Sequence, residues 1–394
     1  MSLKRQLLVS FALQGAGAAA VLLATLLLGA RLGPEVQGGF SRVKAEVEFV
    51  AAFAMFGLPQ ALFFYVKAGA LSGRAALRRG LGCALVALPV GALYAGWHHA
   101  TGWALLPMGV AVAAAVAHGQ LRTLLLVRER VAWFNVLTAL PQVLVLVGVL
   151  YVVARGTVDA SQWLALFALA YAVAASVSWW RLRAAPDVQA ATGVGWRALG
   201  HYGLAAWLTA ALATAAVLLV QRWVEAGQGR AALGQFTMAM TLVQVPLTPI
   251  SYATPLLLRR WMEQPGAGAS RRIALRVFGA LLAVAVLVWL AAGAWPDLGL
   301  GAAYAGTTNA LALLLAGGAA EAASRVLTVQ ASASGRPWIG VRAEAARWAA
   351  LAIGWSMLER PALLPVCAVW ALAAWAAALV FVAASRSDAS ERAA

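Results

Sequence analysis

Charge is scarce in this chain, and acidic charge is the scarcest. Only 11% of the 394 residues are charged, with 14 Asp and Glu, and the only lysines stand at positions 4, 44 and 67. Soluble domains carry about 25% charged residues, so this composition is not suited to water. None of the lysines follows a glycine. A Walker-A phosphate loop is therefore excluded, and the chain cannot use ATP through that motif.

Cysteine and histidine are also few. Cys83 and Cys367 both lie in apolar runs, without the spacing of a disulfide or metal site, which predicts small core residues. The histidines at 98, 99, 118 and 201 have no carboxylates spaced for a metal or a catalytic dyad. We interpret them as interfacial, with His118 the candidate for a proton-sensitive group. Ser41 and Lys44 match the Ser-x-x-Lys pattern of serine acylases by chance, since its companion motifs are absent. The sequence predicts no enzyme and no cofactor.

Apolar residues dominate instead. They make up 63% of the chain, with mean hydropathy +0.81, and runs of about 20 residues, enough to cross ~30 Å of hydrocarbon as helix, recur throughout. The first run extends to residue 30, longer than a signal-peptide core, and predicts an uncleaved first span. The fold class predicted is all-α integral membrane, with about twelve transmembrane helices, near residues 7–30, 45–66, 80–97, 103–121, 132–154, 162–180, 202–220, 236–258, 273–294, 302–330, 343–358 and 362–384.

Basic residues occupy alternate connections between these spans. Of the 30 Lys and Arg, 22 fall on the side of the N-terminus and seven on the other side. Positive segments resist translocation, so both termini are predicted to be cytoplasmic. Arg74 and Arg336 are then inside, while His98 and Asp297 face outward. This placement explains the net charge of +16 without nucleic acid as a partner.

The chain also contains an internal repeat. A shift of 196 residues aligns 36–65 with 232–261 and matches glycine, phenylalanine and proline positions, including Pro59 with Pro255. Because six spans separate the copies, we expect two parallel six-helix repeats around a central cleft, as in some secondary transporters. The predicted domains are 1–200 and 201–384, followed by a cytoplasmic tail at 385–394. Pro59 and Pro255 are expected to bend equivalent helices beside the cleft.

Two segments carry a resemblance to a known family. "LGPEVQGGFSRVKAEVEFVAAFAMFGLPQALFFYVKAG", residues 32–69, resembles the junction of the first two spans in bacterial polysaccharide and O-antigen flippases of the Wzx type. "LVQRWVEAGQGRAALGQFTMA", residues 219–239, is similar to their seventh-span exit, with Gln221 where an acidic residue is usual. These flippases belong to the multidrug, oligosaccharidyl-lipid and polysaccharide exporter superfamily. The resemblance implies two six-helix bundles that export an undecaprenyl-diphosphate-linked sugar chain.

Four alternating charges precede the second predicted span. On a helix, Arg42 and Glu46 lie about 40° apart, and Lys44 and Glu48 form a second pair near the opposite side. Glu48 would lie roughly 9 Å deeper than Arg42. Two interpretations stay open: both pairs are interfacial ion pairs at the outer mouth, or at least one pair lines the exit of the sugar path.

Other candidate substrate-binding residues lie in the later spans. Arg222 and Glu225 flank the outer end of the seventh span, and Glu321 and Arg325 form an i, i+4 pair in the tenth. A guanidinium suits a diphosphate because its planar fork donates two hydrogen bonds, although Arg325 snorkelling to the interface explains its position as well. Polar groups inside spans suit sugar hydroxyls, and interhelical hydrogen bonds explain them equally well: Gln14, Gln60, Asn135, Gln142, Gln244 and Asn309.

The sequence thus favours a flippase for an undecaprenyl-diphosphate-linked oligosaccharide, an O-antigen or capsule or exopolysaccharide repeat unit, that works by alternating access in the bacterial inner membrane. Its expected partners are that lipid-linked substrate, the bilayer, and a polysaccharide polymerase with other assembly proteins. One alternative is a multidrug or metabolite antiporter with twelve spans. The other is a membrane glycosyltransferase, polymerase or ligase on the same lipid carrier, which the shortness of the outer connections argues against.

Overall fold

A computed structural model describes residues 3–98, 105–128, 130–156, 159–183, 193–263, 267–359 and 362–391. Within these ranges the chain is all-α and contains no strand, which confirms the predicted fold class. The elements are α1 (Leu3–Ala54), α2 (Leu58–Lys67), α3 (Gly73–His98), α4 (Leu105–Val127), α5 (Val131–Arg155), α6 (Ala160–Arg183), α7 (Trp196–Glu263), α8 (Ala267–Ala291), η2 (Ala302–Tyr304), α9 (Thr307–Ala333), α10 (Trp338–Ser356) and α11 (Leu363–Glu391).

Two of these helices each combine two spans. Gly33 interrupts α1 with φ 84° and ψ 173°, and Gly229 interrupts α7 with φ 81° and ψ −178°, conformations that glycine adopts without strain. Gly33 and Gly229 are 196 residues apart, the predicted repeat. Nine helices among the described residues are long and apolar enough to cross a membrane. Dividing α1 and α7 and adding α10, which carries three charges, gives twelve spans, as predicted.

The second span begins earlier than its apolar run. Helix resumes directly after Gly33, with Pro34 in its first turn, rather than near residue 45. Proline is well suited to that position because its missing N–H has no partner there in any case. The four alternating charges therefore lie inside a helix, and Glu48 is about 21 Å along it from Pro34.

The same span breaks where it was predicted to bend. Phe56 and Gly57 have φ of 53° and 63°, between the end of α1 and the start of α2, and Pro59 lies in the first turn of α2. The Cys83 thiol donates to the carbonyl of Ala54, which this break leaves unpaired, at 3.2 Å. At the equivalent Pro255 there is no such break, and α7 continues as helix. A span can continue through proline when neighbouring groups compensate for the lost hydrogen bond.

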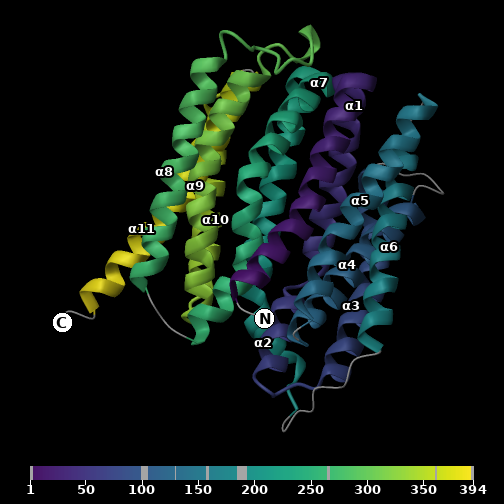
Figure 1. The fold of residues 1–394 in the computed structure, drawn as a ribbon, viewed down its shortest axis with the longest axis vertical. Coiled ribbons are helices and arrows are strands. Elements are labelled where there is room, and N and C mark those ends of the chain that lie inside the picture. The colour runs from purple at the N-terminus through teal and green to yellow at the C-terminus, as the bar shows by residue number, and fades with distance from the viewer. Residues whose placement is uncertain are drawn as a thin grey trace. The chain divides into compact units, whose positions relative to one another are not determined.

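The chain divides into two compact units. Unit 1 comprises Met1–Ala24 and Phe40–Leu218, and unit 2 comprises Thr25–Gly39 and Leu219–Ala394. In unit 1, α4 packs against α2, α3, α5 and α6, and in unit 2, α9 packs against α8, α10 and α11 (Figure 1). These central helices are also the most buried candidate spans. They are the fourth span of each half, so the repeat extends to the packing.

Two glycine positions in unit 2 form a reciprocal contact. A Cβ on Gly38 would lie 2.3 Å from the carbonyl oxygen of Arg230, and a Cβ on Gly234 would lie 2.0 Å from that of Pro34. Gly38 and Gly234 are repeat equivalents, and so are Pro34 and Arg230. The two copies of one segment therefore cross symmetrically, at a distance that only glycine permits. Tyr304 supports this crossing by donating a hydrogen bond to Gln37 Oε1 at 2.6 Å.

Capping groups fix the connection from α5 to α6. Gly156 ends α5 in the left-handed conformation, with φ 74°. Asp159 begins α6 by accepting hydrogen bonds from the Ser161 hydroxyl at 2.6 Å and the Gln162 N–H at 2.9 Å. Both hydrogen bonds stabilise the charged form of the Asp159 carboxyl and so hold its pKa below its ordinary value. The bond from Ser161 has the larger effect, followed by the bond from Gln162.

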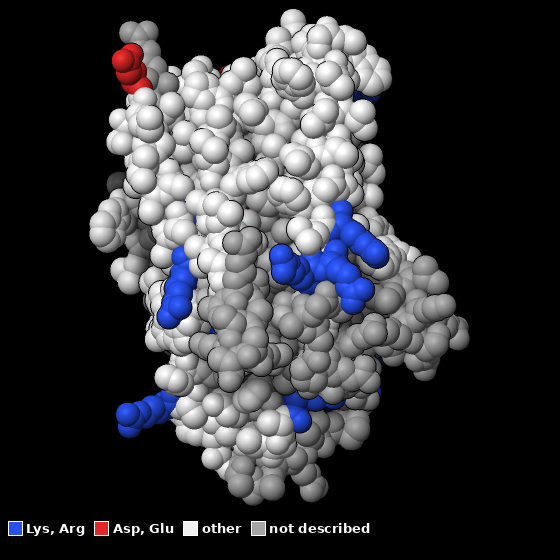
Figure 2. All heavy atoms as spheres, turned by 90° about the vertical axis from the view of Figure 1, so that its left-hand side faces the viewer, with Lys and Arg blue, Asp and Glu red and all other residues white. Residues whose placement is uncertain are grey.

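Charge and apolar surface separate along α8. Arg271, Arg272 and Arg276 are exposed near its N-terminal end, while Leu287 and Trp289 further along are 65% and 64% exposed. Figure 2 shows the face that includes α8 and α11, where uncharged side chains cover a broad area and basic ones gather toward the lower part. An exposed apolar helix with basic residues at one end is typical of a lipid-facing span.

Candidate functional site

Unit 1 contains a cavity of about 240 Å³. Six helices, α1, α2, α4, α5, α6 and α7, contribute to its wall, and each contribution lies within unit 1. Small residues such as Ala51, Ala115 and Gly119 leave the space open. The polar and aromatic lining consists of Glu48, Gln60, His118, Arg122, Thr138, Gln142, Tyr171 and Trp207.

Arg122 supplies the positive charge of this cavity. It is half-buried on α4, where Nη1 donates to Thr138 Oγ1 at 3.3 Å and the guanidinium lies over Phe134, 5.4 Å from the ring centroid. Its Nε is buried without a hydrogen-bond partner among the described residues. None of the ion pairs seen in the described part of the chain includes Arg122. Its charge is thus available to an anion in the cavity.

His118 lies one turn before Arg122 on the same helix. Its side chain is only 4% exposed, donates a hydrogen bond to the carbonyl of Ala174, and packs beside Tyr171 at 5.9 Å between ring centroids. Its Nδ1 is buried and has no partner in the described residues. A neutral imidazole that donates through one nitrogen accepts through the other, so Nδ1 is an unsatisfied acceptor.

The alternating charges form the two ion pairs that helical spacing predicts. Arg42 Nε lies 3.3 Å from Glu46 Oε1, and Lys44 Nζ lies 2.7 Å from Glu48 Oε1. Glu46 is buried, whereas Glu48 is partly exposed and lines the cavity. Lys44 does not line the cavity, so the charged lining residues are Arg122 and Glu48, and Glu48 already has Lys44 as its partner.

An aromatic wall lies beside these polar groups. Trp207 stacks on Phe56, with ring centroids 4.5 Å apart and planes at 22°, and its Nε1 donates to the carbonyl of Phe53 at 2.7 Å. Phe56 is strained, since a non-glycine residue with positive φ costs about 1–3 kcal/mol. One turn before Trp207, Gly203 touches Gly57, where an added Cβ would lie 2.0 Å from the Gly203 carbonyl. This close approach brings Trp207 to the cavity.

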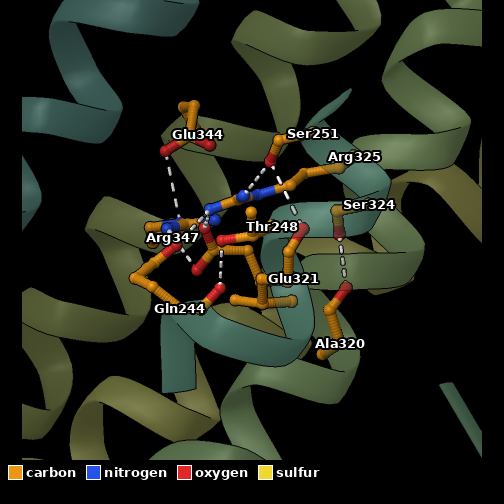
Figure 3. Close-up of polar contacts among 10 residues, drawn as sticks. Gln244, Thr248, Ser251, Ala320, Glu321, Ser324, Arg325, Glu344 and Arg347 are labelled. Atoms are coloured by element: carbon orange, nitrogen blue, oxygen red, sulfur yellow. Dashed lines mark hydrogen bonds and ion pairs between the residues drawn. The ribbon is translucent and has the colours of Figure 1, made fainter. Parts of the chain in front are cut away.

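Unit 2 contains a second polar cluster around Arg325. Arg325 Nη2 donates to Glu321 Oε1 at 2.7 Å, and Nη1 donates to Ser251 Oγ at 2.6 Å. Nη2 also approaches Gln244 Oε1 at 3.4 Å. The predicted pair of Glu321 and Arg325 is therefore present and is joined by Gln244, which comes from α7. Arg325 points into this network rather than away from it (Figure 3).

Arg347 on α10 completes the cluster. Its Nη1 lies 3.9 Å from Glu321 Oε2 and its Nε lies 3.2 Å from Glu344 Oε2. Figure 3 shows Arg325 and Arg347 approaching Glu321 from two sides. Two arginines and two glutamates balance each other in this cluster, whereas Arg122 in unit 1 has no glutamate partner among the described residues.

Several of the predicted site residues belong neither to the cavity lining nor to the Arg325 cluster, among them Gln14, Asn135, Arg222, Glu225 and Asn309. Gln14 donates to Asn135 Oδ1, and Asn135 in turn donates to Ser10 Oγ at 2.7 Å, a buried chain of interhelical hydrogen bonds in unit 1. Arg222 is half-buried on α7, near Glu225, which pairs with Arg230 at 3.4 Å. Asn309 is half-buried in the first turn of α9, about 18 Å along that helix from Glu321.

Several residues of the two sites were not among the sequence candidates. Arg122 falls just beyond the predicted span 103–121, yet α4 extends to Val127. Arg347 falls inside the predicted span 343–358 but was not chosen as a candidate, and it is buried within α10. The i, i+4 spacing of His118 and Arg122 was the one feature of the sequence that could have indicated that both lie on the same face of a helix. No local signal marked Trp207, since its role depends on contact with a residue far away in sequence.

Comparison with known proteins identifies the fold. No protein-family model and no curated protein matches the chain. Solved structures match over nearly its full length: an inward-facing multidrug resistance MATE family transporter of the MOP superfamily (15% identity, TM-score 0.67, 98% of each chain) and the Vibrio cholerae MATE transporter VcmN in the bent form (17%, 0.59, 97% of each). A MOP superfamily transporter from Pyrococcus furiosus, described as having a binding pocket of reverse polarity, also matches (14%, 0.64, 98% of this chain and 96% of that one). The chain therefore shares the fold of these multi-pass membrane transporters.

Proposed function

We propose that this protein is an alternating-access flippase that moves an undecaprenyl-diphosphate-linked oligosaccharide, such as an O-antigen or capsule repeat unit, across the bacterial inner membrane. The fold is that of membrane transporters. The observation that carries the substrate proposal is the Arg122 guanidinium on the wall of the unit 1 cavity. A diphosphate needs charge-assisted donors, and Arg122 has a guanidinium with no acidic partner among the described residues.

The same charges argue against a cationic drug as substrate. A buried cation is best stabilised by a carboxylate that is free to neutralise it. Glu48, the carboxylate that lines the cavity, is already paired with Lys44, and Glu46, Glu321 and Glu344 are paired with arginines. A drug antiporter of the same fold remains the competing proposal, and the experiment below separates the two.

The position of Arg122 agrees with loading from the cytoplasmic leaflet. Arg122 lies near the C-terminal end of α4, the end that charge asymmetry predicts to be cytoplasmic. Lipid-linked sugars assembled on the cytoplasmic side would present their diphosphate at this depth. The proposed partners are the bilayer, a polysaccharide polymerase and other assembly proteins that use the exported product.

Arg122→Ala tests the proposal directly. In a flippase-deleted host that makes the matching sugar, surface polysaccharide should fall at least tenfold, because a hydrogen-bonded charge contributes about 1.5–3 kcal/mol. Arg122→Lys should restore part of it, since the charge remains without the fork. Purified protein in nanodiscs should bind undecaprenyl diphosphate, and Arg122→Ala should weaken that binding by a similar factor.

Arg181→Ala is the matched control. Arg181 is also a half-buried arginine of unit 1, but it stacks on Trp133 and Trp180, at 3.6 and 4.2 Å, and does not line the cavity. The Arg181→Ala substitution should leave export and lipid binding unchanged. Wild-type protein that binds ethidium but not undecaprenyl diphosphate would favour the drug antiporter and refute the flippase.

A further inference from the structure

The wall of the unit 1 cavity contains two hydrogen-bonding groups without partners among the described residues, in addition to the charge of Arg122. Arg122 Nε is an unsatisfied donor, whereas His118 Nδ1 is an unsatisfied acceptor. Phosphate oxygens accept hydrogen bonds and cannot donate one at neutral pH, so a diphosphate satisfies Arg122 but not His118. The missing partner of His118 is a donor, such as a hydroxyl group. A ligand that satisfies both Arg122 and His118 combines an anionic group with a hydroxyl group.

The aromatic wall adds an independent requirement. Trp207 lines the cavity and is held in place by its Nε1 bond to Phe53 and by stacking on Phe56. An aromatic face carries partial negative charge and attracts polarised C–H groups. A pyranose ring has such C–H groups on its faces and hydroxyls around its edge. It can therefore stack on an indole and donate hydrogen bonds in the ring plane at the same time.

The size and the remaining lining agree with one sugar ring. The cavity volume of about 240 Å³ lies just below the roughly 300–1,000 Å³ range of small-ligand pockets, which suits a group about as large as one sugar ring. Gln60 and Gln142 line the same cavity and carry side-chain amides, which both donate and accept. A few polar groups on a mostly apolar wall are typical of small-ligand sites.

We propose that the unit 1 cavity binds a single sugar ring, stacked on Trp207 with a hydroxyl donating to His118 Nδ1, beside the phosphate that Arg122 holds. This inference rests on the proposed flippase function and specifies which part of the substrate enters the cavity. Trp207 then recognises the sugar next to the diphosphate, and Arg122 recognises the diphosphate itself.

Saturation-transfer difference NMR on the full chain in lipid nanodiscs tests this proposal. The probes are methyl α-D-glucopyranoside, methyl β-D-galactopyranoside and methyl N-acetyl-β-D-glucosaminide, and the comparison compound is mannitol, a polyol without a ring. Wild type should transfer saturation to the ring protons of at least one glycoside and not to mannitol. Trp207→Ala should weaken that binding about tenfold, as expected for a lost stacking contact, while Trp207→Phe should keep most of it.

Trp97→Ala is the matched tryptophan control, because Trp97 on α3 is 87% exposed and does not line the cavity. It should bind the glycosides as wild type does. Inorganic pyrophosphate, followed by ³¹P NMR, reports whether the cavity of Trp207→Ala is intact: its binding should persist there and disappear in Arg122→Ala. A Trp207→Ala protein that no longer binds pyrophosphate is replaced by Trp207→Leu for the same comparison.

Two results would overturn the inference: no glycoside signal above empty nanodiscs, or equal glycoside binding by wild type and Trp207→Ala. Pyrophosphate binding without glycoside binding refutes the sugar site and leaves the flippase proposal in place. Glycoside binding with no binding of pyrophosphate or undecaprenyl diphosphate refutes the flippase proposal and supports a sugar site in a different transporter.

Discussion

Arginine inside a membrane span is costly, about 3 kcal/mol at the centre of a helix, and this chain uses it in two different ways. In unit 2, Arg325 and Arg347 are neutralised by Glu321 and Glu344, and all their ion pairs among the described residues are with these two side chains. In unit 1, Arg122 contacts a hydroxyl and an aromatic ring and has no carboxylate in the described residues. The first arrangement is structural, and the second is suited to a ligand.

The structural role of Arg347 leads to a stability prediction. Its side chain is 6% exposed, and its removal leaves Glu344 without its observed cation. Arg347→Met should destabilise the protein by about 3–5 kcal/mol, whereas the double change Arg347→Met with Glu344→Gln should recover most of that loss because no charge stays buried alone. Thermal unfolding in one detergent measures both. Equal melting temperatures for wild type and Arg347→Met would show that Arg347 contributes no net stability.

At the scale of helices, the two glycine breaks shape the crossing in unit 2. Gly33 and Gly229 interrupt α1 and α7 at repeat-equivalent positions, and the helices that follow meet through Gly38 and Gly234. Neither contact involves a side chain, so the cost of a larger residue falls on the backbone, which cannot move aside as a flexible side chain would.

Gly38→Leu and Gly234→Leu should therefore each destabilise unit 2 by about 1–3 kcal/mol through overpacking against the Arg230 and Pro34 carbonyls. Gly39→Leu is the control, because a Cβ on Gly39 meets nothing within 4 Å. Melting temperatures and the monodisperse fraction after heating provide the measurement. A Gly39→Leu protein that is as unstable as Gly38→Leu would show that leucine is harmful anywhere in this segment, and the crossing would not be the cause.

For the whole molecule, the direction of insertion follows from the bias of basic residues. Four single-cysteine variants, made after replacing Cys83 and Cys367 with alanine, test it: Arg74→Cys, Arg336→Cys, His98→Cys and Asp297→Cys. A membrane-impermeant maleimide should label the His98 and Asp297 positions in intact spheroplasts. It should label the Arg74 and Arg336 positions only after permeabilisation. Labelling of the Arg74 position in intact spheroplasts would reverse the predicted orientation.

What the sequence by itself determined is one-dimensional or local. The number of spans follows from the length of the apolar runs, and the repeat follows from self-similarity at a shift of 196 residues. The helical period predicts the ion pairs Arg42–Glu46, Lys44–Glu48 and Glu321–Arg325. Each of these can be read along the chain, and the structure contains each of them. The start of the second span could not be predicted from the sequence, because residues 34–44 are too polar to resemble a membrane helix.

Only the tertiary structure decided which of these residues share a site. Glu48, His118, Thr138 and Trp207 lie on four helices and meet because α4 occupies the centre of unit 1 and Gly57 lets α2 approach Gly203. Hydropathy cannot distinguish Arg122, which faces a cavity, from Arg181, which rests on two tryptophans, since both follow an apolar run. The direction in which a helix turns its charged residue depends on packing against neighbours distant in sequence, and that information appears only in three dimensions.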